Sequence, residues 1–329
     1  MKHFLFKFAF LLTFAFIFFS CEKESTATVS EPTVKMEILP KLSQYKIFKG
    51  NMGDLVPIDG FVEFEHLSHL YTDSCEKVDF LYVPPGKKMT ATSNGILTFP
   101  EGSIIMKTFF FYDDKRNPSL GKHDIETRIL MYTEGKWIGG SYRWREDNSD
   151  ADYIPTGAKV PVRYIDENGK AHGLTFKIAS SKQCLICHNK PDGTFQIIGP
   201  SVKYINRVRE KEPFINQLTH FQNLGILNPM TPSNFIAAAD SQDKSNSLEK
   251  RARGYLDMNC VYCHSKGGSA GFTKLYFDYE LPLAETGILP MKDLIVERMA
   301  DGTMPQIRLY QIDQEGLKLV TEYMNSLPK

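Results

Sequence analysis

The sequence predicts an α+β fold, in which an antiparallel β-domain is followed by an α-helical region. Three observations lead to this prediction. Apolar and polar residues alternate over 125–132, as in a strand with two different faces. Asn168-Gly169 separates the strand-like runs 160–165 and 173–178, and this dipeptide is typical of a hairpin turn. In the second half, apolar residues recur every three to four positions, which indicates helices.

Further elements follow from the same reasoning, and the chain is expected to be β-structured from about Met36 to Ile178. The run from Ser103 to Tyr112 is rich in β-branched and aromatic residues. Trp137 to Trp144 is the expected hairpin partner of the alternating strand, across Glu134-Gly135. The expected helices are Val202 to Leu224, Ser247 to Met258, and a C-terminal helix that carries Leu317, Val320, Met324 and Leu327.

The first 21 residues predict a bacterial lipoprotein signal peptide. A basic start precedes an apolar run, 8–19, which is too short for an ordinary membrane span. A small serine precedes Cys21, whose thiol would be lipidated and become the new N-terminus. An ordinary signal peptide with an incidental cysteine is the alternative. Residues 22–34 are polar and contain proline, so we expect a flexible tether there.

Composition and leader together limit the partners. Lys+Arg and Asp+Glu are equal at 39 each, so no basic excess points to nucleic acid. Both interpretations of the leader place the mature chain outside the cytoplasm. The lipid anchor would hold it at a membrane in the cell envelope, on the periplasmic side or at the outer-membrane surface. Glu22, which follows the cysteine, resembles an outer-membrane sorting signal.

Four of the six cysteines form two Cys-x-x-Cys-His motifs, at 184–188 and 260–264. This motif predicts covalent attachment of a c-type haem. Two thiols three positions apart on a helical turn can bond to both vinyl groups of one haem, and the adjacent histidine then ligates the iron. The sequence therefore predicts two haems, with His188 and His264 as iron ligands. The cofactor-binding residues are Cys184, Cys187, His188, Cys260, Cys263 and His264.

Two other uses of the four cysteines are open. A zinc site usually separates its two cysteine pairs by about 15–20 residues. Cys187 and Cys260 lie much further apart, and zinc would not explain a histidine after both pairs. Two disulfides of the thioredoxin type would suit an exported protein, but the βαβ pattern of that fold is missing.

Met304 is the expected sixth ligand of the second haem. It lies in the loop Asp301-Gly302-Thr303-Met304-Pro305, just before the C-terminal helix. Ligation by histidine and methionine raises the reduction potential of a haem. A core methionine is the alternative. The region 246–329 resembles a monohaem cytochrome c domain, and this resemblance implies that the leading and closing helices cross with Gly254 packed near the aromatic Tyr323.

The first haem has a less certain sixth ligand. Met230 lies in a proline-containing loop at 228–232, and its spacing from His188 echoes that of Met304 from His264. However, the strand-like residues 174–178, and not a helix, precede Cys184, so the first module is incomplete. We expect Met230 as the ligand, with His172, His220 or an open position as alternatives.

The remaining single residues predict less. Arg298 and Arg308 flank Met304 and could neutralise haem propionates. Cys75 is expected to be buried. The other histidines of the first half are expected to be structural or at the surface, and they are His66, His69 and His123.

Several stretches resemble a family of bacterial diheme c-type cytochromes with a β-rich front half. The matching residues are Phe99-Pro100-x-Gly102-x-Ile104-x-x-Lys107-Thr108-Phe109, Ile125-Glu126-Thr127-Arg128, Tyr142-x-Trp144, Asp150-Ala151, Gln183-Cys184-x-x-Cys187-His188, Ile198-Gly199-Pro200 and Asn216-Gln217-Leu218. The resemblance implies a redox function in the envelope and supplies no substrate. Thr72-Asp73-Ser74-Cys75 departs from the family pattern, so no role carries over to Cys75.

The expected organisation has five parts, namely the signal peptide 1–21, the tether 22–34, a β-rich domain 35–180, a first haem segment 181–245 and a cytochrome c-like domain 246–329 with the second haem. The expected function is electron transfer between redox protein partners of the envelope by a membrane-anchored diheme cytochrome. The alternatives are a diheme enzyme of the peroxidase type with an open axial site at the first haem, and a haem-based sensor.

Overall fold

The computed structural model describes residues 34–68, 70–188, 195, 197–306 and 311–328. The expected signal peptide, Cys21 and nearly all of the expected tether lie outside the described residues. Residues 33–329 form one compact unit, which includes the expected β-rich domain and both haem segments. Among the described helices, none is long and apolar enough to span a membrane.

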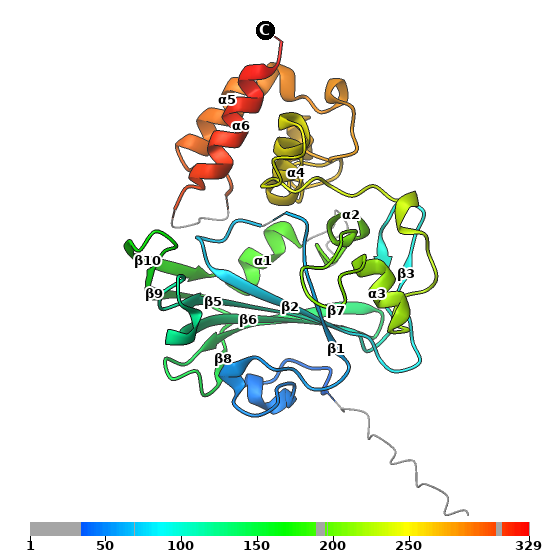
Figure 1. The fold of residues 1–329 in the computed structure, drawn as a ribbon, viewed down its shortest axis with the longest axis vertical. Coiled ribbons are helices and arrows are strands. Elements are labelled where there is room, and N and C mark those ends of the chain that lie inside the picture. The colour runs from blue at the N-terminus through cyan, green and yellow to red at the C-terminus, as the bar shows by residue number, and fades with distance from the viewer. Residues whose placement is uncertain (1–33, 69, 189–194, 196, 307–310, 329) are drawn as a thin grey trace, which may run out of the picture. The chain divides into compact units, whose positions relative to one another are not determined.

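An antiparallel sheet of six strands, in the order β1-β2-β5-β6-β7-β8, is the centre of the first half (Figure 1). Two smaller antiparallel pairs, β9 with β10 and β3 with β4, lie outside it. The strands are β1 (Phe61–Phe64), β2 (Glu76–Tyr82), β3 (Thr90–Ala91), β4 (Leu97–Thr98), β5 (Ile104–Tyr112), β6 (Lys122–Thr133), β7 (Lys136–Trp144), β8 (Ala151–Tyr153), β9 (Ala158–Ile165) and β10 (Ala171–Ile178).

The second half is helical, so the α+β class is confirmed. The helices are α1 (Ser181–Cys187), α2 (Val202–Ile205), α3 (Gln217–Asn223), α4 (Leu248–Cys260), α5 (Ile288–Ala300) and α6 (Gln314–Ser326). The expected helix at 247–258 corresponds to α4, with Ser247 as its N-cap. The expected C-terminal helix corresponds to α6, which begins after the N-cap Asp313.

Two helix predictions need correction. The expected helix from Val202 to Leu224 is wrong in its middle, because α2 ends at Ile205 and α3 begins only at Gln217. Pro213, in the intervening segment, has no N–H for a helical hydrogen bond. Asn216 then caps α3 by accepting from Leu218 N at 2.9 Å. Helix α5 was not expected, because proline usually interrupts a helix. The proline of α5 lies in its first turn, where proline is tolerated.

A β-bulge interrupts the alternation of side chains along the central strand β6. Phe109 of β5 pairs with Glu126 and Phe110 pairs with Asp124, so Ile125 has no partner on β5. As a result Ile125 packs on the opposite side of the sheet from Ile129. The expected alternation therefore holds beyond the bulge but not across it.

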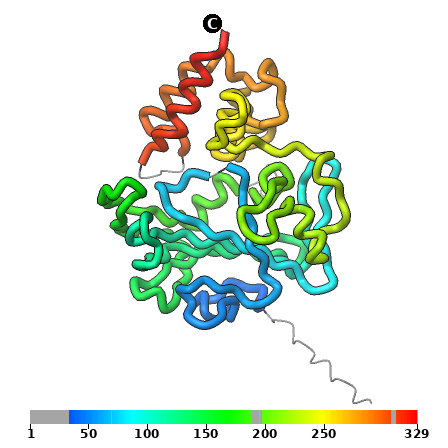
Figure 2. Tube along the Cα trace, viewed as in Figure 1, coloured from blue at the N-terminus to red at the C-terminus, as the bar shows by residue number. Residues whose placement is uncertain are grey.

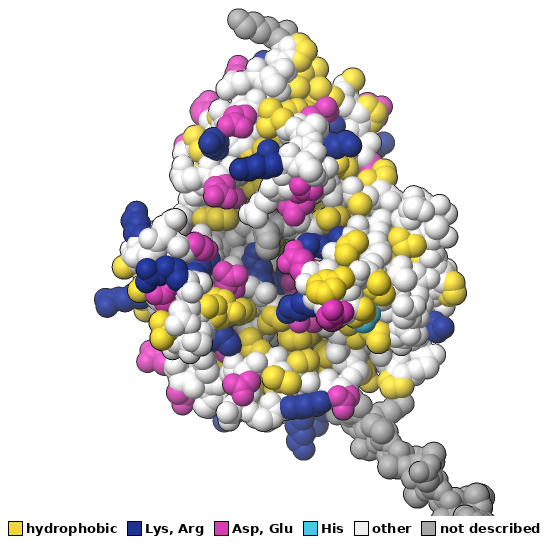
Figure 3. Space-filling model, in the orientation of Figure 1, with side chains coloured by type: hydrophobic (Ala, Val, Ile, Leu, Met, Phe, Trp, Pro, Cys, Tyr) yellow, Lys and Arg dark blue, Asp and Glu magenta, His cyan; other side chains and the backbone are white. Residues whose placement is uncertain are grey.

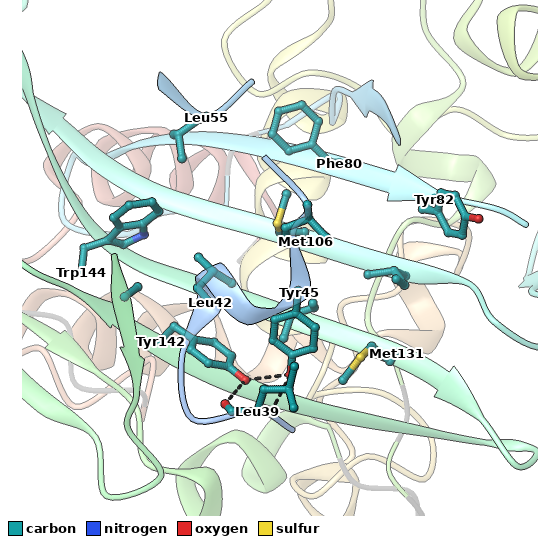
Figure 4. Packing of buried hydrophobic residues seen from close by; sticks show 14 of the residues in the cluster. Leu39, Leu42, Tyr45, Leu55, Phe80, Tyr82, Met106, Met131, Tyr142 and Trp144 are labelled. Carbon is teal, nitrogen blue, oxygen red and sulfur yellow. Dashed lines mark hydrogen bonds between the residues drawn. The ribbon is translucent and has the colours of Figure 1, made fainter. Parts of the chain in front are cut away.

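One face of the sheet is covered by the N-terminal segment 34–58. Tyr142 of β7 is fully buried there, and its hydroxyl donates to the Leu39 carbonyl at 2.8 Å (Figure 4). The Tyr45 hydroxyl lies 2.8 Å from that of Tyr142, so the two tyrosines join the segment to the sheet. This face is therefore closed by an apolar core.

The opposite face is covered only in part. Leu81 and Ile105 pack against α2 and α3, while Phe109 and Phe111 pack against the β9–β10 pair. The loop between β1 and β2 lies beside α4, as the trace in Figure 2 shows, and Tyr71 N donates to the Asn259 side chain at 2.8 Å. The uncovered middle of this face becomes the floor of the site described next.

Candidate functional site

Both Cys-x-x-Cys-His motifs have the same local backbone. In the first, the backbone N–H of His188 donates to the Cys184 carbonyl at 3.0 Å, and in the second His264 donates to Cys260 at 3.0 Å. Each motif is thus a helical turn that brings its two thiols and its histidine together. The first motif is on α1, which follows β10 directly and begins with a capping box between Ser180 and Gln183.

The two motifs open onto one cavity of about 1370 Å³. Ligand pockets commonly have volumes of about 300–1,000 Å³, so this cavity has room for more than one large ligand. Figure 3 shows a hollow between the helices and the sheet, with Lys, Arg, Asp and Glu side chains gathered around it. The motif residues that line the cavity are Cys184, Cys187, His188, Cys260, Cys263 and His264.

The thiols of Cys187 and Cys263 lie within hydrogen-bond reach of each other. This contact raises the pKa of Cys187 and lowers the pKa of Cys263, because the proton of one thiol stabilises the thiolate of the other. Burial raises the pKa of Cys260 to about 12. The two motifs therefore meet at their second cysteines.

The bonding state of the described cysteines can be compared with the alternatives of a zinc site and of disulfides. All five, Cys75 included, are free thiols. Among the described residues, no group of three or more His, Cys, Asp or Glu side chains is placed to hold a metal ion. A haem places no such demand on the protein, since one or two axial ligands hold its iron.

The second histidine is suited to ligate iron. Burial lowers the pKa of His264, and a hydrogen bond to the backbone of Leu275 opposes this shift. The neutral imidazole is the form that binds metals. Phe277 packs edge-on against the ring, with 5.3 Å between the ring centroids. The first histidine, His188, stacks on Phe195 at 5.0 Å.

Met304 lines the same cavity as His264. Its loop precedes α6, and the Met304 backbone N–H donates to the Arg298 carbonyl at 2.9 Å. Arg298 also lines the cavity, with its guanidinium 3.4 Å from the Asp301 carboxylate. Arg308 lies outside the described residues.

The structure does not bring Met230 to the cavity. Met230 packs against the cluster formed by α2, α3 and β3–β4, and its N–H donates to the Gln222 side chain at 2.9 Å. The rival ligands are also elsewhere, because His172 pairs with Asp166 at 2.7 Å in the β9–β10 hairpin and His220 lies on α3. None of these three residues lines the cavity.

His66 does line the cavity, although it was expected to be structural or at the surface. It follows β1 and packs near Phe64 and Tyr204, with centroid distances of 5.3 and 6.4 Å. No motif near His66 in the sequence indicates a functional role for it. His69 lies outside the described residues, and His123 is a half-exposed surface residue 3.0 Å from Asp113.

A buried carboxylate connects α4 with α2. Asp257, on α4 three residues before Cys260, is fully buried. It accepts hydrogen bonds from Lys203 Nζ at 2.8 Å and from the hydroxyl of Tyr204, both from α2, and from Tyr279 N at 2.6 Å. Three donors from two other parts of the chain thus converge on one side chain.

Comparison of the chain with protein-family models, curated proteins and solved structures finds no match. The expected membership of a diheme cytochrome family therefore depends on the motifs quoted above.

The crossing of α4 and α6 differs in detail from the expectation. A Cβ on Gly254 would lie 2.1 Å from the Ala239 carbonyl oxygen, so this glycine faces a loop and not Tyr323. The close approach of the helices occurs instead at Gly316 of α6, where a Cβ would lie 2.2 Å from the Tyr255 ring of α4. The two helices do pack with a glycine against an aromatic ring. The glycine comes from α6 and the aromatic ring from α4, which is the reverse of the expectation.

We expect Asp257→Ala to lower the free energy of unfolding by about 3 kcal/mol, because it leaves the Lys203 ammonium and the Tyr204 hydroxyl without their buried acceptor. Urea unfolding of the purified protein measures this. Asp293→Ala, at an exposed position of α5, is the control and should change stability by less than about 0.5 kcal/mol. Equal effects of the two variants would contradict the role given to Asp257.

Proposed function

We propose that this chain is a lipid-anchored diheme c-type cytochrome of the cell envelope, which passes electrons between redox protein partners. The observation that carries the proposal is the convergence of two Cys-x-x-Cys-His turns of the same backbone geometry on one large cavity. Free thiols at all four motif cysteines support thioether attachment of one haem at each motif.

The residues around the cavity fit two haems. The haems would supply the one-electron chemistry, each iron changing between its ferrous and ferric forms. The protein attaches the cofactors through Cys184 and Cys187 in one case and Cys260 and Cys263 in the other, and it presents a histidine to each iron. Because Cys187 and Cys263 are in contact, the two attachment sites are adjacent, which favours electron exchange between them.

The second haem suits an electron carrier. His264 and Met304 line the cavity together, and methionine is an axial ligand that raises the potential of a haem. An iron with both axial positions filled has no place for a substrate. The lipid anchor at Cys21 would keep this carrier beside a membrane, on the periplasmic side or at the outer-membrane surface.

Replacement of both cysteines of one motif should remove one haem only. We expect Cys184→Ala/Cys187→Ala, produced with a haem-maturation system, to keep the haem at 260–264, because each motif is a complete helical turn of its own. Mass spectrometry and haem staining measure this. Cys75→Ala is the matched control and should keep both haems, and a wild-type mass equal to that of the bare polypeptide would refute covalent attachment.

The Met304→Ala variant should lose the ferric absorption band typical of methionine-ligated haem, and its potential should fall, because water is a weaker ligand for ferrous iron than a thioether. Visible spectra and redox titration test this. Met299→Ala replaces another cavity-lining methionine, on α5, and should keep the band. Persistence of the band in Met304→Ala would exclude Met304 as the ligand.

A second candidate function is a diheme enzyme of the peroxidase type. The observation that favours it is the position of Met230 outside the cavity, while His66, a possible acid–base group, lines it. Cyanide binding separates the two functions. A carrier whose first iron has a sixth ligand from the protein should not bind cyanide there, whereas an enzyme with an open site should bind it. His66→Ala then tests whether the histidine is needed for turnover of a peroxide.

A further inference from the structure

Three cationic side chains form the floor of the cavity next to the first motif. Lys77 on β2, Lys107 on β5 and Arg128 on β6 point from neighbouring strands into the space between the sheet and the helices. We call these three residues the floor cations. Arg128 is the floor cation whose charge acts on Cys184, where it opposes the rise in pKa that burial causes, and all three cations line the same cavity as this cysteine.

The floor cations have fewer negative partners than positive charges. Lys107 Nζ lies 3.2 Å from Asp79. Arg128 donates from Nε and Nη2 to the two oxygens of Glu126, at 2.8 and 3.0 Å. Lys77 donates only to the Leu70 carbonyl, and among the described residues no carboxylate lies within ion-pair distance of it. Lys77 is therefore the one floor cation without an ion pair among the described residues, although the charges of Asp79 and Glu76 act on it from further away.

The nearby carboxylates are already used by other cations. Glu76 pairs with Lys115 at 2.9 Å, and Glu63 pairs with Lys211 at 2.5 Å. Burial lowers the pKa of Lys77 to about 8, which records the cost of holding this ammonium away from water. A buried cation is usually paired, so the free donors of this floor indicate a missing anionic partner.

Arg128 also has a donor that its ion pair with Glu126 does not use. Its Nε and Nη2 are used by Glu126, and Nη1 has no acceptor among the described residues. The guanidinium is fixed from below as well, since its central carbon lies 4.6 Å from the centroid of the Phe109 ring. A guanidinium held in this way is preorganised to bind an oxygen anion.

We propose that the floor cations form a binding site for an anionic oxygen group, of the carboxylate or oxyanion class, beside the first haem motif. The inference rests on the proposed function for the identity of its neighbour, a haem on Cys184 and Cys187. Two sources could supply the group. One is a propionate of that haem, and the other is a free oxyanion that enters the cavity.

The test uses the holoprotein and the variant Lys77→Met, which removes the floor cation that has no ion pair and leaves no carboxylate unpaired. Arg128→Lys is a second variant, because it keeps the positive charge and the pairing with Glu126 but removes the planar set of guanidinium N–H donors. Lys170→Met, in the turn between β9 and β10, is the matched control for loss of one exposed positive charge. Mass spectrometry first establishes that each protein carries both haems.

A propionate source predicts that Lys77→Met lowers the midpoint potential of the first haem, because loss of a nearby cation favours the ferric form. The second haem and Lys170→Met should keep their potentials, and added sulfate or phosphate should have no effect. A free-oxyanion source predicts that calorimetry detects saturable binding of sulfate or phosphate to the wild type. This binding should be at least about tenfold weaker in Lys77→Met, for loss of one charge-assisted hydrogen bond.

The inference is overturned if Lys77→Met and Arg128→Lys have the potential of the wild type and no protein binds either anion. A different result marks failure of the proposed function. If the wild type carries no haem at Cys184 and Cys187, the cytochrome proposal fails at the first motif, and the calorimetric measurement alone then decides for or against the anion site.

Discussion

The hydrogen bonds to the Asp257 carboxylate hold the two halves of the site together. Lys203 and Tyr204 belong to α2, which packs on the sheet, whereas Asp257 belongs to the helix that ends in the second motif. A charge in the interior is tolerated only when donors surround it, so this side chain accepts a single arrangement of its neighbours. Because α4 leads into the second motif, the network that fixes α4 also helps to place Cys263 beside Cys187 of α1.

The sheet contributes to the site in a way that differs from the helices. Its closed face has an apolar core tied by Tyr45 and Tyr142, which makes it a rigid platform. The open face carries charged residues on adjacent strands and forms the floor of the cavity. The β-rich half of the chain therefore supplies charged side chains to a cavity whose Cys-x-x-Cys-His motifs lie on α1 and at the end of α4.

Local patterns in the sequence predicted local structure well. The Asn168-Gly169 turn, the β6–β7 hairpin and the helix α4 each depend on residues close together in the chain. The floor of the cavity was not predicted, because Lys77, Lys107 and Arg128 become neighbours only when three strands pair. The spacing of Met230 from His188 predicted a ligand by analogy with Met304, yet a similar spacing does not give the same direction when one module begins from a strand and the other from a helix.

The alternation of side chains along β2, β5 and β6 links the stability of the sheet to the chemistry of the cavity. A slip of one residue in the pairing of these strands would turn every inward charge toward the apolar layer beneath and every apolar side chain toward the cavity. The bulge at Ile125 contributes to this arrangement, because it changes which face of the sheet the residues of β6 before Glu126 point to. Insertion or deletion of a single residue in these strands would thus invert the polarity of the site while leaving the attachment motifs intact.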